Sequence, residues 1–101
     1  MTVFRRVRRR DGMFIIAQVL EMAQEPNLKT QIMYKASLSF AQLNEYLSTL
    51  LHLGLLEAIK DEKGERTAYK TTSKGLRYLE AYNEIRKLLN KEQVVKHKRG
   101  S

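Results

Sequence analysis

The hydrophobic period of the chain changes at Gly54, and this change constrains the fold more than any other feature. Before Gly54, apolar side chains recur at helical spacing, at Phe40, Leu43, Leu47, Leu50 and Leu51. They predict an amphipathic helix over about residues 40–53, with Ser39 as its N-cap and Gly54 as the left-handed residue that ends it. After Gly54, residues 55–60 and 66–71 are strand-like and flank the turn sequence DEKGE. The pattern therefore predicts a helix followed directly by a β-hairpin.

Three further helices are expected around this centre. Asp11 is suited to cap a first helix of about residues 12–25, which ends before Pro26. A short second helix fits residues 28–36, and a long last helix fits about residues 74–92, with Thr72 or Ser73 as its cap. The order helix, helix, tight turn, helix, two-stranded hairpin, long helix is that of a winged helix-turn-helix. The expected fold is thus mainly α with a small β-hairpin and a long C-terminal helix.

The positive charge is concentrated at the two ends of the chain. Residues 1–10 carry a net charge of +5, residues 86–101 carry another +5, and the 75 residues between them carry eight basic and ten acidic side chains. We therefore divide the chain into a basic N-terminal arm (1–10), a winged-helix domain (11–92, with a dimerisation helix at 73–92) and a basic tail (93–101). No apolar run is long enough to cross a bilayer and no signal-peptide cleavage pattern is present, so a cytoplasmic, nucleoid-associated protein is expected.

The charge distribution and the fold together predict how double-stranded DNA would be bound. A helix of the 40–53 type fits the major groove, where its outer polar side chains meet base edges. The predicted DNA-binding residues are the outer face of this helix, two lysines of the second helix, two cations of the hairpin and five arginines of the arm: Ser39, Gln42, Glu45, Ser48 and Thr49; Lys29 and Lys35; Lys63 and Arg66; Arg5, Arg6, Arg8, Arg9 and Arg10. The plainer alternative is that these are solvated surface residues and a solubilising arm.

The last helix carries a short apolar seam. Tyr78, Tyr82, Ile85 and Leu89 are spaced by four, three and four residues, as in a coiled coil. Leu76, Leu79 and Leu88 are assigned to the core of the domain itself. We therefore predict a homodimer formed through the seam; the alternative is one wide buried face in a monomer.

Two stretches resemble a known family. MYKASLSFAQLNEYLSTLLHLGLLE, followed by YKTTSKGLRYLEAYNEI, is similar to archaeal winged-helix proteins of the predicted transcriptional-regulator type. This group includes the small dimeric chromatin-type DNA-binding proteins of Sulfolobales. The resemblance spans about residues 13–92 and implies DNA binding through residues 39–49 and the wing, and dimerisation through the last helix.

Catalysis is not expected. The chain has no cysteine, and His52 and His97 are 45 positions apart, so no metal-ligand spacing occurs. Neither a phosphate-binding glycine loop nor a nucleophile motif is present. We expect no cofactor, no metal and no small-molecule ligand. The alternatives to a regulator are an architectural chromatin protein, a winged helix that docks another protein, and an RNA binder that relies on its tails.

Overall fold

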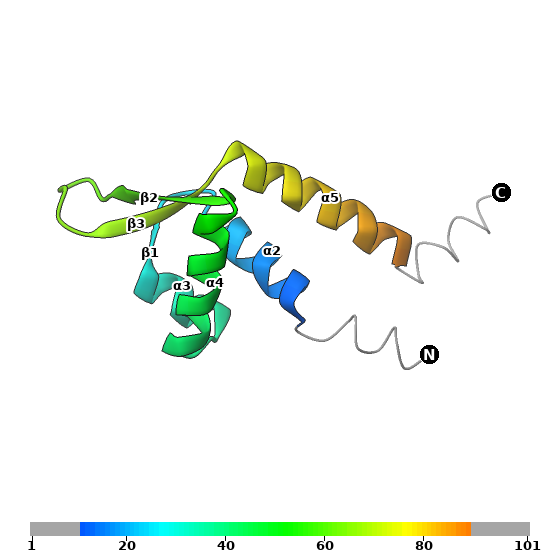
Figure 1. Cartoon of the computed structure of the whole chain (residues 1–101), viewed down its shortest axis with the longest axis horizontal. Coiled ribbons are helices and arrows are strands. Elements are labelled where there is room, and N and C mark those ends of the chain that lie inside the picture. Colours follow the sequence, from blue (N-terminus) through cyan, green and yellow to red (C-terminus); the bar gives the residue numbers. More distant parts are fainter. Residues whose placement is uncertain (1–10, 90–101) are drawn as a thin grey trace.

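The computed structural model describes residues 11–89. Within this range the elements follow the winged-helix order, which confirms the fold expected from the sequence (Figure 1). They are α2 (Gly12–Met22), β1 (Asn27–Leu28), α3 (Lys29–Ala36), α4 (Phe40–His52), β2 (Leu56–Lys60), β3 (Thr67–Thr71) and α5 (Ser73–Leu89). The hairpin projects from one end of the helical body, and α5 leaves in the opposite direction (Figure 1).

The first helix begins where its cap predicts and ends early. The backbone N–H of Phe14 donates to Asp11 Oδ1 at 2.8 Å, which satisfies one of the free donors of the first turn. The helix stops at Met22, three residues before the expected end at residue 25. The side-chain amide of Asn27 donates to the carbonyl of Met22 at 3.1 Å, so the free end of the helix is closed by a residue beyond Pro26.

The sheet has three strands within the described residues, where the sequence predicted two. β1 pairs antiparallel with β3, which lies between β1 and β2. Leu28 was expected to open the second helix, but its backbone is extended (φ −79°, ψ 155°) and it precedes that helix. A strand of two residues is too short to show an alternating pattern, which is why the sequence did not reveal it.

The turn between α3 and α4 is as tight as predicted. Ser37 adopts a left-handed conformation (φ 55°), and the N–H of Leu38 donates to the carbonyl of Met33 at 3.1 Å. Ser39 then caps α4, because its hydroxyl accepts the N–H of Gln42. Short connections of this kind leave α3 and α4 little freedom relative to each other.

The core lies between the helices and the base of the hairpin. Its largest fully buried side chains are Val19, Leu20, Ile32, Leu43 and Leu50. Phe40 was placed with this stripe, but its side chain is 61% exposed. It stands in the first turn of α4, where Lys29 of α3, and not the core, lies against its ring.

The start of α5 packs closely against the sheet, as Gly75 in its first turn suggested. A Cβ atom at Gly75 would lie 2.6 Å from Cγ2 of Thr71 and would also collide with the carbonyl oxygen of Leu55. The hydroxyl of Thr72 accepts the N–H of Gly75 and donates to the carbonyl of Gly54, so Thr72 is the cap. This arrangement fixes the direction in which α5 leaves the body.

The assignment of α5 residues to the core is wrong for Leu76 and Leu88. Leu79 is buried, but Leu76 is exposed and the side chain of Leu88 is 76% exposed. Leu79 and Leu88 are nine residues apart, which at 100° per residue places them on opposite sides of the helix. Leu79 and Leu88 therefore cannot belong to the same face of α5.

Across residues 11–89, none of the helices combines the length and the apolar character that crossing a membrane requires.

Candidate nucleic-acid interface

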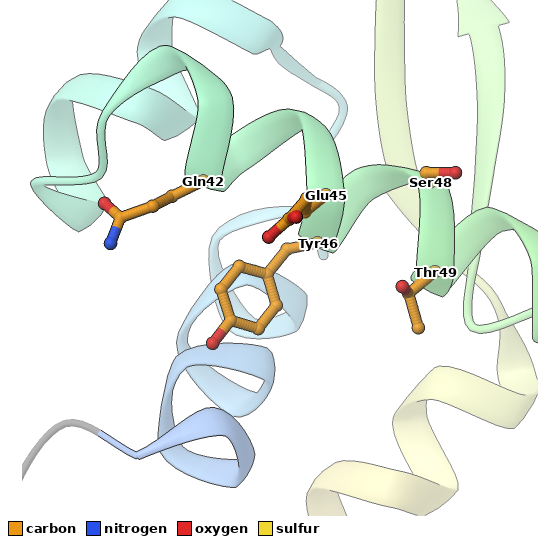
Figure 2. Close-up of a pocket in the computed structure, with 5 residues that line it drawn as sticks. All are labelled: Gln42, Glu45, Tyr46, Ser48 and Thr49. Atoms are coloured by element: carbon orange, nitrogen blue, oxygen red, sulfur yellow. The ribbon is translucent and has the colours of Figure 1, made fainter.

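The outer face of α4 is exposed, as the sequence predicted. Three leucines, Leu43, Leu47 and Leu50, anchor the inner face in the core. The side chains of Gln42, Glu45, Ser48 and Thr49 are all exposed. Together with Tyr46 they line an open depression along the helix (Figure 2). The structure thus brings four of the predicted DNA-binding residues onto one continuous surface.

The capping interaction limits what Gln42 and Ser39 can recognise. Oε1 of Gln42 accepts the backbone N–H of Ser39 at 3.0 Å, while the Ser39 hydroxyl accepts the N–H of Gln42 at 3.1 Å. Recognition of adenine by a glutamine uses both the amide oxygen and the amide nitrogen. In this arrangement one lone pair of the Gln42 oxygen is occupied by the cap, while the amide N–H₂ and the serine O–H keep their capacity to donate. This end of α4 is therefore suited to acceptors on bases or phosphates.

Tyr46 is a residue of this surface that the sequence reasoning missed. Its side chain extends from α4 toward the first turn of α2 (Figure 2), and a Cβ atom at Gly12 would lie 3.8 Å from its hydroxyl. It stands on the flank of α4, between the polar and apolar stripes. A half-buried tyrosine with its hydroxyl near the surface can hydrogen-bond a ligand while its ring stays packed.

The two lysines of α3 differ in their surroundings. The ammonium of Lys29 lies 4.6 Å from the centroid of the Phe40 ring, a cation–π contact at the start of α4. Lys35 is exposed in the last turn of α3. Lys29 thus lies beside the start of α4, whereas Lys35 lies about 1.7 turns further along α3.

The tip of the hairpin is held together by Asp61. Oδ1 of Asp61 accepts the N–H of Glu65 at 2.9 Å, and Oδ2 lies 3.5 Å from Nε of Arg66. The bond from Glu65 and the contacts with Arg66 lower the pKa of the Asp61 carboxyl, against a weaker opposing effect of desolvation. Of the two predicted wing cations, Arg66 is therefore engaged within the hairpin, and Lys63 is exposed at its tip.

The seam on α5 is continuous, but only its first half is covered. Tyr78 and Tyr82 are stacked, with ring centroids 6.3 Å apart, and the Tyr78 hydroxyl donates to the carbonyl of Met13 at 3.1 Å. Burial, the nearby Tyr82 and Asp11 raise the pKa of the Tyr78 phenol, in that order of effect. The side chains of Ile85 and Leu89 are 41% and 42% exposed. The two tyrosines thus rest on the protein's own body at α2. The helix α5 extends past α2 (Figure 1), and its last turns carry Ile85 and Leu89.

The described body is electrically neutral, with ten basic and ten acidic side chains in residues 11–89. The arginines of the arm (Arg5, Arg6, Arg8, Arg9, Arg10) and the tail at 93–101 lie outside the described residues. The net positive charge of the chain therefore comes from residues outside the described range.

Comparisons with known proteins agree with this architecture. A family model described as winged helix-turn-helix matches residues 9–90, which confirms the resemblance seen in the sequence. A search of curated proteins finds no match.

Solved structures with the same fold include two from Sulfolobus solfataricus. The first is the DNA-binding protein Sso10a-2, with a TM-score of 0.72 and 23% identity, where the match covers 90% of this chain and 94% of that one. The second is the transcriptional regulator BldR, with a TM-score of 0.63 and 19% identity, covering 86% of this chain and 70% of that one. A MepR mutant of S. aureus bound to an oligodeoxyribonucleotide also matches, with a TM-score of 0.61 and 15% identity, over 87% of this chain and 70% of that one.

Proposed function

We propose, on the premise that this chain belongs to the winged helix-turn-helix family, that it binds double-stranded DNA and regulates transcription. In this proposal α4 lies in the major groove, and Gln42, Glu45, Ser48 and Thr49 face the base edges. The observation that carries it is the exposed polar face of α4, presented by a helix whose other face is anchored in the core. A rigidly held helix of this diameter fits the major groove, which is about 12 Å wide.

The proposed mechanism divides the work between the body and the ends of the chain. Phosphate contacts orient a protein on DNA and supply most of the non-specific affinity, whereas base contacts supply sequence preference. The described body has no net charge, so we assign most of this non-specific affinity to the ends of the chain. The arm, Arg5 to Arg10, and the basic tail supply it, and Lys29, Lys35 and Lys63 add phosphate contacts beside α4 and at the wing.

A homodimer through α5 is part of the proposal. The seam residues Ile85 and Leu89 are half exposed beyond the part of α5 that rests on α2. A second copy of α5 laid against this half would remove apolar surface from water, which stabilises the association by roughly 25 cal/mol per Å² buried. A dimer would also present two copies of α4 to the DNA, so a two-fold symmetric binding site is expected.

A titration of binding against salt tests the DNA proposal. If about six phosphates are neutralised, the logarithm of the association constant should fall with the logarithm of salt concentration with a slope of roughly −5 on duplex DNA. A flat dependence would favour a protein partner, and equal affinity for single-stranded RNA would favour the RNA-binding alternative. Removal of residues 1–10 should weaken binding to all duplexes alike. Selective loss at one site would contradict the role given to the arm.

A footprint on genomic DNA separates the two remaining roles. A regulator should protect discrete sites with two-fold symmetry, whereas an architectural chromatin protein should protect DNA with little sequence preference. Nucleoid association is a further part of the proposal, and co-sedimentation with nucleoids from lysed cells would test it. We propose a binding protein and assign no catalytic step to any residue.

A further inference from the structure

Phe40 is a large apolar side chain exposed at the start of α4, beside the polar outer face of that helix. It is the first residue of α4, and the side chains around it in that turn, Ser39, Ala41 and Gln42, are exposed as well. More than half of its own surface meets water. The core of the domain is already closed by Leu43 and Leu47 behind it, so Phe40 adds little to the packing that holds α4 in place.

The ring of Phe40 nevertheless contacts a charged side chain. The ammonium of Lys29 lies 4.6 Å from its centroid, so the start of α3 and the start of α4 are joined through this pair. The contact places a positive charge beside an exposed apolar ring. An apolar ring beside a cation is complementary to a partner that presents an apolar group close to a negative charge.

We propose that Phe40 packs against the C5-methyl group of a thymine in the major groove, while Lys29 reaches a neighbouring phosphate. This inference rests on the proposed function, because it requires α4 to enter the groove. The N-terminal residues of a recognition helix are those that contact base edges, and the thymine methyl is the apolar feature that a phenylalanine can recognise there. DNA presents this methyl group within a groove bordered by phosphates, which matches the Phe40–Lys29 pair in both respects.

The neighbouring polar groups fit the same assignment. In the capping interaction Gln42 and Ser39 accept through their side-chain oxygens, so their amide N–H₂ and O–H groups can still donate to a ligand. The O4 oxygen of thymine and the N7 nitrogen of adenine are acceptors in the major groove. An A·T pair therefore offers both the methyl group for Phe40 and acceptors for the donors next to it. Phe40 becomes a residue that determines specificity, and Lys29 a residue that positions it.

The experiment compares duplexes that differ only in the methyl group. Binding of the full chain to a 24-base-pair alternating A·T duplex is measured by fluorescence anisotropy, and then to the same duplex with deoxyuridine in place of thymidine. Loss of one buried methyl should raise the Kd about fourfold. The Phe40→Ala variant should bind the two duplexes equally. Because Phe40 is largely exposed, this variant should keep the wild-type far-UV circular dichroism spectrum.

Two controls isolate the residue and the chemical group. The Tyr34→Ala variant removes an aromatic side chain that is 85% exposed on the adjacent helix α3, and it should retain the full ratio between the duplexes. A G·C duplex in which cytosine is replaced by 5-methylcytosine carries a methyl group at the equivalent position in the groove. The wild type should bind it more tightly than the unmodified duplex, by a similar factor, and Phe40→Ala should not.

The outcomes distinguish this inference from the proposed function. Equal affinity of the wild type for the thymidine and deoxyuridine duplexes would overturn the role of Phe40 and leave DNA binding intact. A ratio that survives in Phe40→Ala would also overturn it, because the methyl group would then be sensed elsewhere. Tighter binding to a single strand than to either duplex, abolished by Phe40→Ala, would show base stacking in its place. Failure to bind any duplex would overturn the proposed function itself.

Discussion

The contact between Gly75 and the sheet yields the most quantitative prediction. Replacing Gly75 by alanine would place a methyl group 2.6 Å from Cγ2 of Thr71 and against the carbonyl oxygen of Leu55. Both neighbours are constrained. Thr71 is buried and its hydroxyl donates to the carbonyl of Leu20 at 2.6 Å, while the carbonyl of Leu55 accepts the N–H of Thr72 at 3.1 Å. The added methyl group therefore cannot be accommodated by rotation of one flexible side chain.

The expected change in the free energy of unfolding follows from two destabilising effects and one stabilising effect. Forcing a methyl group into a well-packed site costs typically about 1–3 kcal/mol. Displacing Leu55 weakens a backbone hydrogen bond worth about 1 kcal/mol. Alanine is favoured over glycine inside a helix by about 1 kcal/mol, which offsets part of this loss. We expect Gly75→Ala to lower the free energy of unfolding by about 2 kcal/mol, and the Tm of a domain this size by about 8–16 °C.

Thermal unfolding followed by circular dichroism measures this effect, and Gly12 supplies a matched control. A Cβ atom at Gly12 meets nothing nearer than the Tyr46 hydroxyl at 3.8 Å, an ordinary contact. Gly12→Ala should therefore unfold at the wild-type temperature or slightly above it. A Gly75→Ala protein as stable as the wild type would refute the argument that close backbone approach sets the direction of α5.

Three further changes test the cap, the wing and the seam. Ser39→Ala removes the hydroxyl that accepts the Gln42 N–H and should lower the free energy of unfolding by about 1 kcal/mol in urea titrations; an unchanged midpoint would show that the cap is dispensable. Asp61 should titrate below its ordinary pKa of 3.8. Its stabilisation of the hairpin is therefore present at neutral pH and is lost as the pH falls through the lowered pKa. An NMR titration giving the ordinary pKa would contradict this. Replacing Tyr82 and Ile85 together by glutamate should give a monomer in analytical ultracentrifugation, and an unchanged dimer mass would exclude the seam. Lys87→Glu, on the side of α5 opposite the seam, is the control that should leave the dimer intact.

The candidate site was predictable where a residue's role depends on local geometry. The exposure of Gln42, Glu45, Ser48 and Thr49 follows from their positions opposite the leucine stripe of one helix, and a helix repeats regularly enough to show this in the sequence. The engagement of the Gln42 oxygen in the cap was also readable, because serine at the N-cap with glutamine three residues later is a known pattern. The sequence reasoning used the two residues separately and missed the consequence for base recognition.

The sequence by itself determined the order and the nature of the main elements. Their signals are the hydrophobic periods, the caps at Asp11 and Ser39, and the left-handed Gly54. Each of these depends on interactions over a few neighbouring residues, so it can be recognised in the sequence. Only the tertiary structure decided which neighbouring element covers, or fails to cover, a given apolar side chain. Phe40 is at the surface because α3 offers it Lys29 and no apolar cover, β1 exists because β3 lies next to it, and the seam of α5 is half covered because α2 is shorter than the helix lying on it. Periodicity states which side chains share a face, but the neighbour that covers a face comes from distant parts of the chain.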